Sequence, residues 1–288
     1  MIAGRSGNYE RRKRRVPTTS DNFACARYAR GMGDGPLRIF IGWDEREPQA
    51  YEVARFSLER HASIPVEVTP IKLEELRARG LYRRGEDPLA ATQFTYSRFL
   101  TPALAGYQGW ALFCDCDFLW LGDVAELRNF ADETKALFCV QHDYRPTETT
   151  KMDGKVQSVY PRKNWSSLMF FNCDHPSVRK LTPEVVNRET GAYLHRLQWL
   201  EDDEIGALPE EWNWLEGWSK RPASGAPKAV HFTRGGPWFE QWQQVDYADL
   251  WLAERAAFMA THSLGPDRAL QQTSASTEEI ESAICSPR

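Results

Sequence analysis

Short apolar segments alternate with amphipathic ones along the middle of the chain. The apolar runs are rich in β-branched and aromatic residues and predict buried strands at 37–43, 66–73, 110–122, 136–140, 164–172 and 228–233. Between them, apolar positions recur at three- and four-residue spacing and predict helices over 50–62, 74–81, 94–106, 176–189 and 190–199. This alternation predicts an α/β fold in a single domain, with a mixed, mostly parallel sheet flanked by helices.

The two ends of the chain lack this pattern. Residues 1–35 contain five consecutive basic residues, Arg11 to Arg15, and no apolar periodicity, so we expect a disordered basic leader. Residues 263–288 are rich in Ser, Thr and Gln and are expected to form a flexible tail. The folded domain is therefore expected at 36–262. The basic run indicates either a solvated tail or a weak contact with an anionic membrane surface.

Charge and composition narrow the classes of protein that fit. The 288 residues have a formal net charge of -4, but residues 1–35 are net +5 and the remainder is net -9. Such an acidic body lacks the basic face that binds nucleic acid. No apolar run is longer than Trp110 to Cys114, which is far too short to cross a membrane, and no apolar signal segment follows the first residues. We expect a cytoplasmic protein, with contact at the inner membrane face as the alternative.

The most informative chemistry lies in the segment WALFCDCDFLWLG, where two carboxylates interrupt an apolar run. An unpaired carboxylate is costly to bury, so Asp115 and Asp117 are expected to share a partner. Mg²⁺ and Mn²⁺ favour carboxylate oxygens and keep positions open for substrate phosphates. Two other interpretations stay open: the two acids cap a turn that leaves the sheet, or Cys114 and Cys116 form a thiolate site. The six cysteines show no zinc-type spacing, which favours reduced, structural thiols.

Other polar residues follow the apolar runs, and ligands of open parallel sheets bind at the carboxyl ends of the strands. The residues at such positions are Asp44, Asp115, Asp117, Asn172 and His231. A neutral imidazole at His231 would complete an Asp/Asp metal site without adding charge, although a lone histidine at a strand end is more often structural. The following Gly235 would let the backbone approach a phosphate, and Arg234 could contact a phosphate oxygen.

Four segments in order resemble glycosyltransferases of the GT-A fold, especially the family 8 group that includes galactosyltransferases and glycogenin. The DxD-like segment is WALFCDCDFLWLG, and the others are IFIGWDE, QFTYSRFLTPAL and AVHFTRGGPWFEQW, together spanning roughly 37 to 242. The resemblance implies a GT-A, Rossmann-like domain. It also implies a metal-dependent enzyme that moves a hexose from a UDP-linked donor to a hydroxyl of a saccharide, lipid or protein, with retention of configuration.

The resemblance also implies roles for single residues. Asp115, Asp117 and His231 would hold Mn²⁺ or Mg²⁺. The residues expected to contact the donor are Asp44, Arg98, Asp115, Cys116, Asp117, Trp165, Ser166, Asp203, Arg234 and Gly235. Two departures stand out, because Gly236 replaces a usual lysine and Trp165 replaces an asparagine that contacts the sugar. The first leaves the phosphate contact open, with Arg234 as the candidate replacement, and the second predicts an altered sugar pocket.

The segment LQWLEDDEIGALPEEWNW resembles the family's DQDxLN and LPxxWN elements. It would place Asp202 at the reacting carbon, as an electrostatic stabiliser, a transient nucleophile or a general base. The competing interpretation is an acidic, solvated helix start, which the helix dipole favours.

Two other functions stay open. The main alternative is a carbohydrate-binding or scaffold protein on a decayed transferase fold, which the intact DxD argues against. A nucleotidyltransferase would need a glycine-rich loop after the first strand, where this chain has WDEREPQ.

Overall fold

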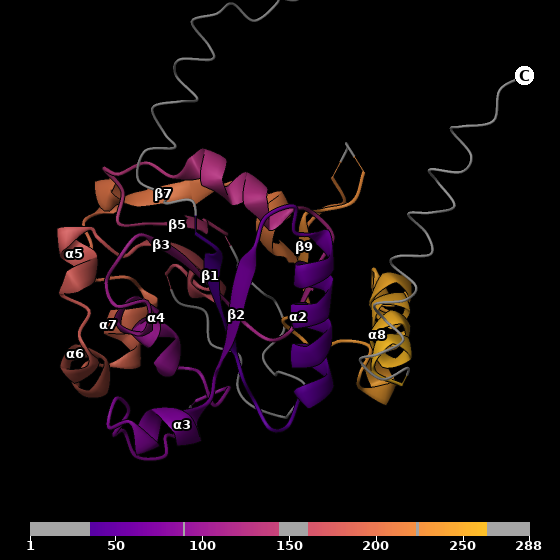
Figure 1. Ribbon diagram of the computed structural model, residues 1–288, viewed down its shortest axis with the longest axis horizontal. Helices are drawn as coiled ribbons and strands as arrows, with labels where there is room; N and C mark the ends of the chain where they lie inside the picture. Colours follow the sequence, from indigo (N-terminus) through magenta and orange to yellow (C-terminus); the bar gives the residue numbers. More distant parts are fainter. Residues whose placement is uncertain (1–34, 89, 144–160, 223–224, 264–288) are drawn as a thin grey trace, which may run out of the picture.

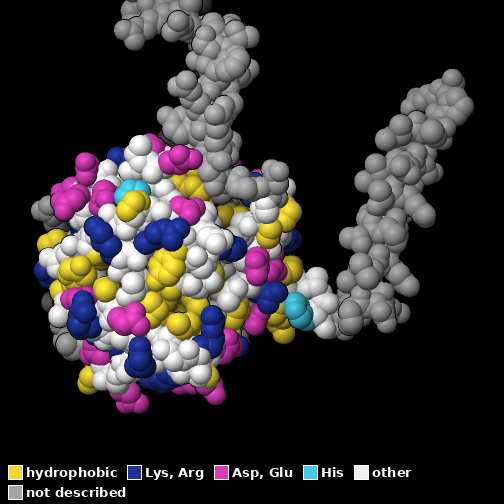
Figure 2. Space-filling model, turned by 60° about the vertical axis from the view of Figure 1, so that its left-hand side comes forward, with side chains coloured by type: hydrophobic (Ala, Val, Ile, Leu, Met, Phe, Trp, Pro, Cys, Tyr) yellow, Lys and Arg dark blue, Asp and Glu magenta, His cyan; other side chains and the backbone are white. Residues whose placement is uncertain are grey.

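The computed structural model describes residues 35–88, 90–143, 161–222 and 225–263. The expected leader and tail, and the membrane contact assigned to the leader, therefore fall almost wholly outside the described residues. None of the described helices combines the length and the apolar character of a membrane span. On the face shown in Figure 2, acidic and basic side chains are interspersed among small apolar areas, so their fields partly cancel at longer range.

The described residues form a central six-stranded sheet flanked by helices (Figure 1). In spatial order its strands are β2 (Val66–Ile71), β1 (Leu37–Gly42), β3 (Trp110–Cys114), β6 (Leu168–Asn172), β5 (Leu137–Val140) and β7 (Ile205–Leu208). Neighbouring strands pair in parallel except at β6, which is antiparallel to both β3 and β5. The predicted mixed, mostly parallel sheet is confirmed.

The prediction of a single strand over 110–122 is wrong, because this segment contributes one strand to the central sheet and another to a second sheet. Its strands, in the described part of the chain, are β4 (Phe118–Trp120), β9 (Ala229–His231) and β8 (Trp214–Leu215). The chain leaves the central sheet after Cys114, turns through Asp115–Asp117 and enters the second sheet at Phe118. Both flanking strands are wholly buried, so their apolar residues appear continuous in sequence. The two carboxylates therefore belong to the turn between the sheets and to neither of the buried strands.

The direction of β6 corrects a second expectation. The predicted strand over 164–172 begins only at Leu168, because Trp165–Ser167 form a 3₁₀ turn, η4. Leu168 pairs with Cys114 at the carboxyl end of β3, whereas Asn172 pairs with Trp110 at the opposite edge. There the Asn172 amide donates to two backbone carbonyls. Asn172 was expected at the ligand-binding edge, and this expectation is wrong because the apolar pattern does not encode strand direction.

The helices are shorter than predicted in the middle of the chain. Helices α2 (Pro48–His61) and α3 (Leu73–Ala78) match their predicted positions. The predicted helix over 94–106 is reduced to the 3₁₀ segment η2 (Ser97–Leu100) and one turn, α4 (Thr101–Leu104). Residues 176–199 contain three short helices, two of which start at a proline and two of which follow a threonine cap: α5 (Pro176–Arg179), α6 (Pro183–Arg188) and α7 (Gly191–His195).

The last described element, α8 (Ala248–Ser263), was not predicted. It lies beside α2 at the outside of the molecule (Figure 1). Its Trp251 is fully buried in a small core with Val53 and Trp214, and Glu254 pairs with Arg60 at 2.8 Å. Four 3₁₀ segments complete the described elements: η3 (Val124–Phe130), η5 (Asp202–Glu204), η6 (Glu210–Asn213) and η7 (Glu240–Trp242).

Candidate metal centre

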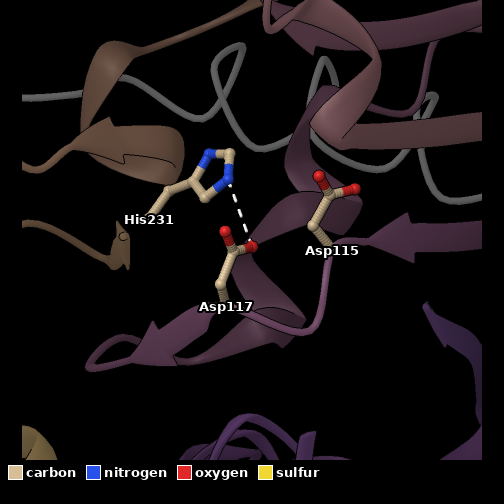
Figure 3. Close-up of side chains that lie close together, drawn as sticks. All are labelled: Asp115, Asp117 and His231. Carbon is tan, nitrogen blue, oxygen red and sulfur yellow. Dashed lines mark ion pairs between the residues drawn. The ribbon is translucent and has the colours of Figure 1, made fainter. Parts of the chain in front are cut away.

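Asp115, Asp117 and His231 meet where the two sheets join (Figure 3). One potential ligand atom from each residue lies within 4.8 Å of the other two. Strand pairing produces this convergence, because β4 pairs with β9 and sets Phe118 opposite His231. The backbone nitrogen of Phe232 also donates to the Asp117 carbonyl at 3.0 Å. The structure thus brings together the three residues that the sequence predicted as metal ligands.

The contact between Asp117 and His231 tests whether a cation fits. Asp117 Oδ1 lies 3.2 Å from His231 Nε2, is buried and accepts no hydrogen bond from the described residues. The other ring nitrogen, Nδ1, is 2.9 Å from Oδ1 of the buried Asn213. A neutral imidazole that donates from Nδ1 presents the lone pair of Nε2 to the carboxylate, so two acceptors face each other. A divalent ion between them would satisfy both, and the residues therefore fit a metal.

Asp115 is held by an arginine rather than by His231. Arg98 Nη1 donates to Asp115 Oδ1 at 2.7 Å and to the Ser166 carbonyl at 2.9 Å. The guanidinium lies against the rings of Phe94 and Phe113, and both members of the ion pair are largely buried. Arg98 thus lies at the site and its charge balances one of the two carboxylates, while its predicted contact with the donor stays a prediction.

Glu47 adds a further acid that the sequence reasoning missed. Burial, followed by the nearby charges of Asp117 and Asp44, raises the pKa of Glu47 to about 8. Glu47 is the N-cap residue of α2, but its side chain caps none of the described backbone groups. The signal in the sequence was an acid three residues after Asp44, directly beyond the first strand. A cation at the cluster would draw the proton from this group.

Asp44 is fully buried just after β1, and both oxygens of its carboxylate already accept hydrogen bonds from the protein. Its two oxygens accept hydrogen bonds from the Arg46 side chain at 2.9 and 2.7 Å, and from the backbone of Arg46 and Gln93. Burial would raise the pKa of Asp44, but these hydrogen bonds outweigh it and hold the pKa below its ordinary value. In this conformation Asp44 ties the end of β1 to the segment at Gln93, and its predicted contact with the nucleotide stays a prediction.

The cysteines of the turn remain thiols. Burial, followed by the charge of the nearest acid, Asp115 for Cys114 and Asp117 for Cys116, raises the pKa of both thiols well above the ordinary value. A thiolate is the form that binds metal, so this environment disfavours the CxC alternative. The side chain of Cys116 is buried, and any contact of Cys116 with a donor would involve its backbone.

Residues of η4 line the same edge of the sheet. The Asp115 nitrogen donates to the Ser167 carbonyl at 2.9 Å, which attaches η4 to the acidic turn. Ser166 Oγ lies 2.8 Å from His195 Nδ1, and Trp165 Nε1 donates to the His142 carbonyl at 3.0 Å. The Ser166 carbonyl reaches the cluster through Arg98, and the predicted contacts of Trp165 and Ser166 with the donor stay predictions.

His142 was not predicted. Its ring is hydrogen-bonded to the backbone of Asn213, and its buried Nε2 has no hydrogen-bond partner within the described part of the chain. Burial, followed by the charge of His231, lowers the pKa of His142 to about 3. His142 is therefore a neutral imidazole close to the cluster.

Comparison with known proteins identifies the relatives of this chain. No protein-family model matches the sequence. Protein CDI of Arabidopsis thaliana is 54% identical over 237 residues, which cover 81% of this chain and 92% of that protein. The chain belongs to the family of Protein CDI.

The fold of this CDI family member is similar to that of a glycosyltransferase. The apo form of GlyE from Streptococcus pneumoniae TIGR4 matches with a TM-score of 0.51 and 15% identity, over 77% of this chain and 60% of that one. A second structure of GlyE gives 0.50 and 14%, over 76% and 60%. This chain thus spans less than two thirds of GlyE. At this identity the likeness shows the fold alone, which is of the GT-A type.

Two predicted acids of the CDI family member lie away from the cluster. Ile205, the first residue of β7, pairs with Leu137, the first residue of the parallel strand β5. Asp202 and Asp203 come just before β7 in the chain, so they lie at the edge of the sheet where these two strands begin. Asp115, in contrast, follows the carboxyl end of β3. The Asp202 side chain is 89% exposed and is ion-paired with Arg162. The structure therefore does not bring Asp202 or Asp203 together with the metal cluster.

Arg234 and Gly235 lie in the turn shortly after β9. Arg234 donates to both carboxylate oxygens of the buried Glu216, at 3.2 and 3.0 Å, so its charge is already balanced within the protein. Gly235 has a φ of 116°, a conformation that a side chain would strain, and its nitrogen donates to the Phe232 carbonyl. The glycine shapes the turn after the histidine, and the phosphate contact predicted for both residues stays a prediction.

Proposed function

We propose that this CDI family member is a metal-dependent glycosyltransferase that moves a hexose from a UDP-linked donor to an acceptor hydroxyl. The observation that carries the proposal is the convergence of Asp115, Asp117 and His231 at the carboxyl edge of a GT-A-type sheet. Two carboxylates and a neutral imidazole form a donor set that suits Mn²⁺ or Mg²⁺. The acceptor would be a saccharide, a lipid or a protein hydroxyl.

The residues around the cluster suit the binding of an anionic donor. A divalent ion bound there would offset the negative charge that grows on the diphosphate leaving group. Arg98 balances Asp115, while Asp117 Oδ1 remains without a hydrogen bond from the described residues. Glu47, whose pKa is raised to about 8, is protonated near neutral pH and adds little negative charge until a cation arrives. We therefore expect Asp117 Oδ1 to be the first oxygen that binds the metal ion.

The stereochemical part of the proposal depends on the resemblance to family 8, which implies retention. Asp202 is the sequence candidate for the reaction-centre acid, but its exposed position before the amino edge places it apart from the cluster. We therefore base the proposed function on the metal site and assign no chemical step to Asp202.

A donor panel tests the proposal. The purified protein would be incubated with UDP-linked and other nucleoside diphosphate hexoses, with Mn²⁺, Mg²⁺ or a chelator, and the released nucleotide would be measured. We expect metal-dependent release from at least one UDP-hexose and a loss of this release in Asp117→Asn. Asp246→Asn, which removes an exposed acid paired with Arg221, is the matched control and should retain activity. No release from any donor with either metal would overturn the proposal.

A further inference from the structure

Asn213 connects the two halves of the metal cluster. It ends η6, is fully buried, and places its side chain between His231 of β9 and Ser167 of η4. Its Oδ1 lies 2.9 Å from His231 Nδ1, and its Nδ2 lies 2.9 Å from Ser167 Oγ. Ser167 in turn accepts the Asp115 nitrogen at its backbone carbonyl. A continuous chain of contacts thus runs from the acidic turn to the histidine.

The direction of these hydrogen bonds fixes the orientation of the amide. Ser167 Oγ donates its only proton to the Asn164 carbonyl at 2.7 Å, so it can only accept from Asn213. The amide nitrogen of Asn213 also points toward the Asn164 carbonyl, at 3.5 Å. The nitrogen of the amide therefore faces η4, and its oxygen faces the imidazole. An oxygen cannot donate, so the proton between Asn213 and His231 belongs to His231 Nδ1.

From this geometry we propose that Asn213 is a positioning residue that holds His231 as the Nδ1–H tautomer, with the lone pair of Nε2 directed at Asp117. The Phe118 ring stacks on the imidazole, with centroids 4.4 Å apart and planes 19° apart, and sets the plane of the ring. Asn213 then determines which nitrogen carries the proton. Metal-binding histidines are commonly oriented by such a hydrogen bond on the second nitrogen.

The effect of Asn213 on metal affinity rests on the proposed function, whereas its effect on the tautomer does not. The two are therefore measured separately. The tautomer of His231 is measured in the metal-free protein by ¹⁵N NMR of labelled histidine, with the signal assigned by its loss in His231→Gln. The affinity for Mn²⁺ alone is measured by calorimetry on the same samples.

Three variants separate positioning from packing. Asn213→Leu has a similar volume but no acceptor, and we expect His231 to lose its preference for Nδ1–H and Mn²⁺ affinity to fall about 10- to 100-fold. Asn213→Asp keeps the acceptor and should keep the tautomer. Asn172→Leu removes another buried asparagine, at the opposite edge of the sheet, and should leave both measurements unchanged.

The outcomes distinguish this inference from the proposed function. A wild-type His231 protonated at Nε2, or an unchanged tautomer in Asn213→Leu, would overturn the positioning role. If Asn213→Leu does not fold, the smaller Asn213→Ala also removes the acceptor, and an unchanged preference for Nδ1–H in that variant would overturn it equally. Loss of Mn²⁺ binding in the wild type with the tautomer as expected would instead overturn the metal site and leave the hydrogen-bonding role intact.

Discussion

Asp117 Oδ1 lies 3.2 Å from His231 Nε2, and neither atom has a proton to offer the other when the imidazole donates from Nδ1. In that tautomer the metal-free protein holds two acceptors in apposition. This arrangement costs stability in the absence of a ligand and favours the binding of a cation. Several consequences can be measured.

Replacing Asp117 with asparagine should act in opposite directions on stability and on metal binding. The amide can donate to His231 Nε2, so we expect the metal-free variant to be more stable than the wild type by about 1 kcal/mol. We also expect Mn²⁺ affinity to fall at least about 100-fold, because a charged ligand is lost. Denaturant unfolding and calorimetry would measure the two effects. A destabilised variant with intact Mn²⁺ affinity would show that Asp117 has a structural role instead.

Removing Arg98 should destabilise the fold through its partner. Arg98→Leu leaves Asp115 largely buried without its cation, and breaking such a pair costs about 3 to 5 kcal/mol. The double variant Arg98→Leu/Asp115→Asn should recover much of this loss, because the stranded charge is also removed. Urea unfolding of the wild type, both single variants and the double variant gives the coupling energy. Additive single effects would contradict a coupled pair.

Metal binding should release a proton from Glu47. With a pKa of about 8, Glu47 is mostly protonated at pH 7, and a nearby cation favours its charged form. Calorimetry of Mn²⁺ binding in buffers of different ionisation enthalpy should show the release of close to one proton at pH 7. Glu47→Gln should abolish most of this release. Equal proton release in the variant would assign the proton to another group.

His142 should make the stability of the fold fall with decreasing pH. Burial, followed by the charge of His231, lowers its pKa from about 6.5 to about 3, so between these values the unfolded chain binds more protons than the folded one. The stabilisation from neutral His142 is complete above about pH 6.5 and is lost as the pH falls toward 3. By pH 4 the loss should reach about 3 kcal/mol. The free energy of unfolding, measured from pH 7 to 4, should vary less with pH in His142→Gln than in the wild type. An equal pH dependence in the two proteins would contradict this role.

The sequence predicts the fold where the apolar pattern is local. The strand at Leu37–Gly42 and the helix at Pro48–His61 lie where alternation and spacing placed them. The break between Cys114 and Phe118 was not predicted, because both flanking strands are buried and only three residues separate them. Strand direction is also absent from such a pattern, which is why Asn172 was placed at the wrong edge.

The residues of the candidate site also divide into those that a local sequence pattern reveals and those that depend on contacts between distant segments. The pair Asp115 and Asp117 is visible because charges inside an apolar run are rare, and the resemblance added His231. Asn213 is visible only as the last residue of the LPxxWN-like element, without a role, because its contact with His231 joins segments far apart in the chain. His142 likewise acts through distant contacts, which no local pattern reports. Asp202 matched a motif, but the register of β7 decides its position, and register depends on the whole sheet.

Calorimetric titration of UDP into the protein, with and without Mn²⁺, tests the proposed metal and nucleotide site most directly. We predict that UDP binds in the presence of Mn²⁺, that a chelator abolishes the binding, and that His231→Gln weakens it strongly. UDP binding that is unaffected by Mn²⁺, or no UDP binding while a saccharide still binds without metal, would contradict the proposed site and favour a carbohydrate-binding protein on a transferase fold.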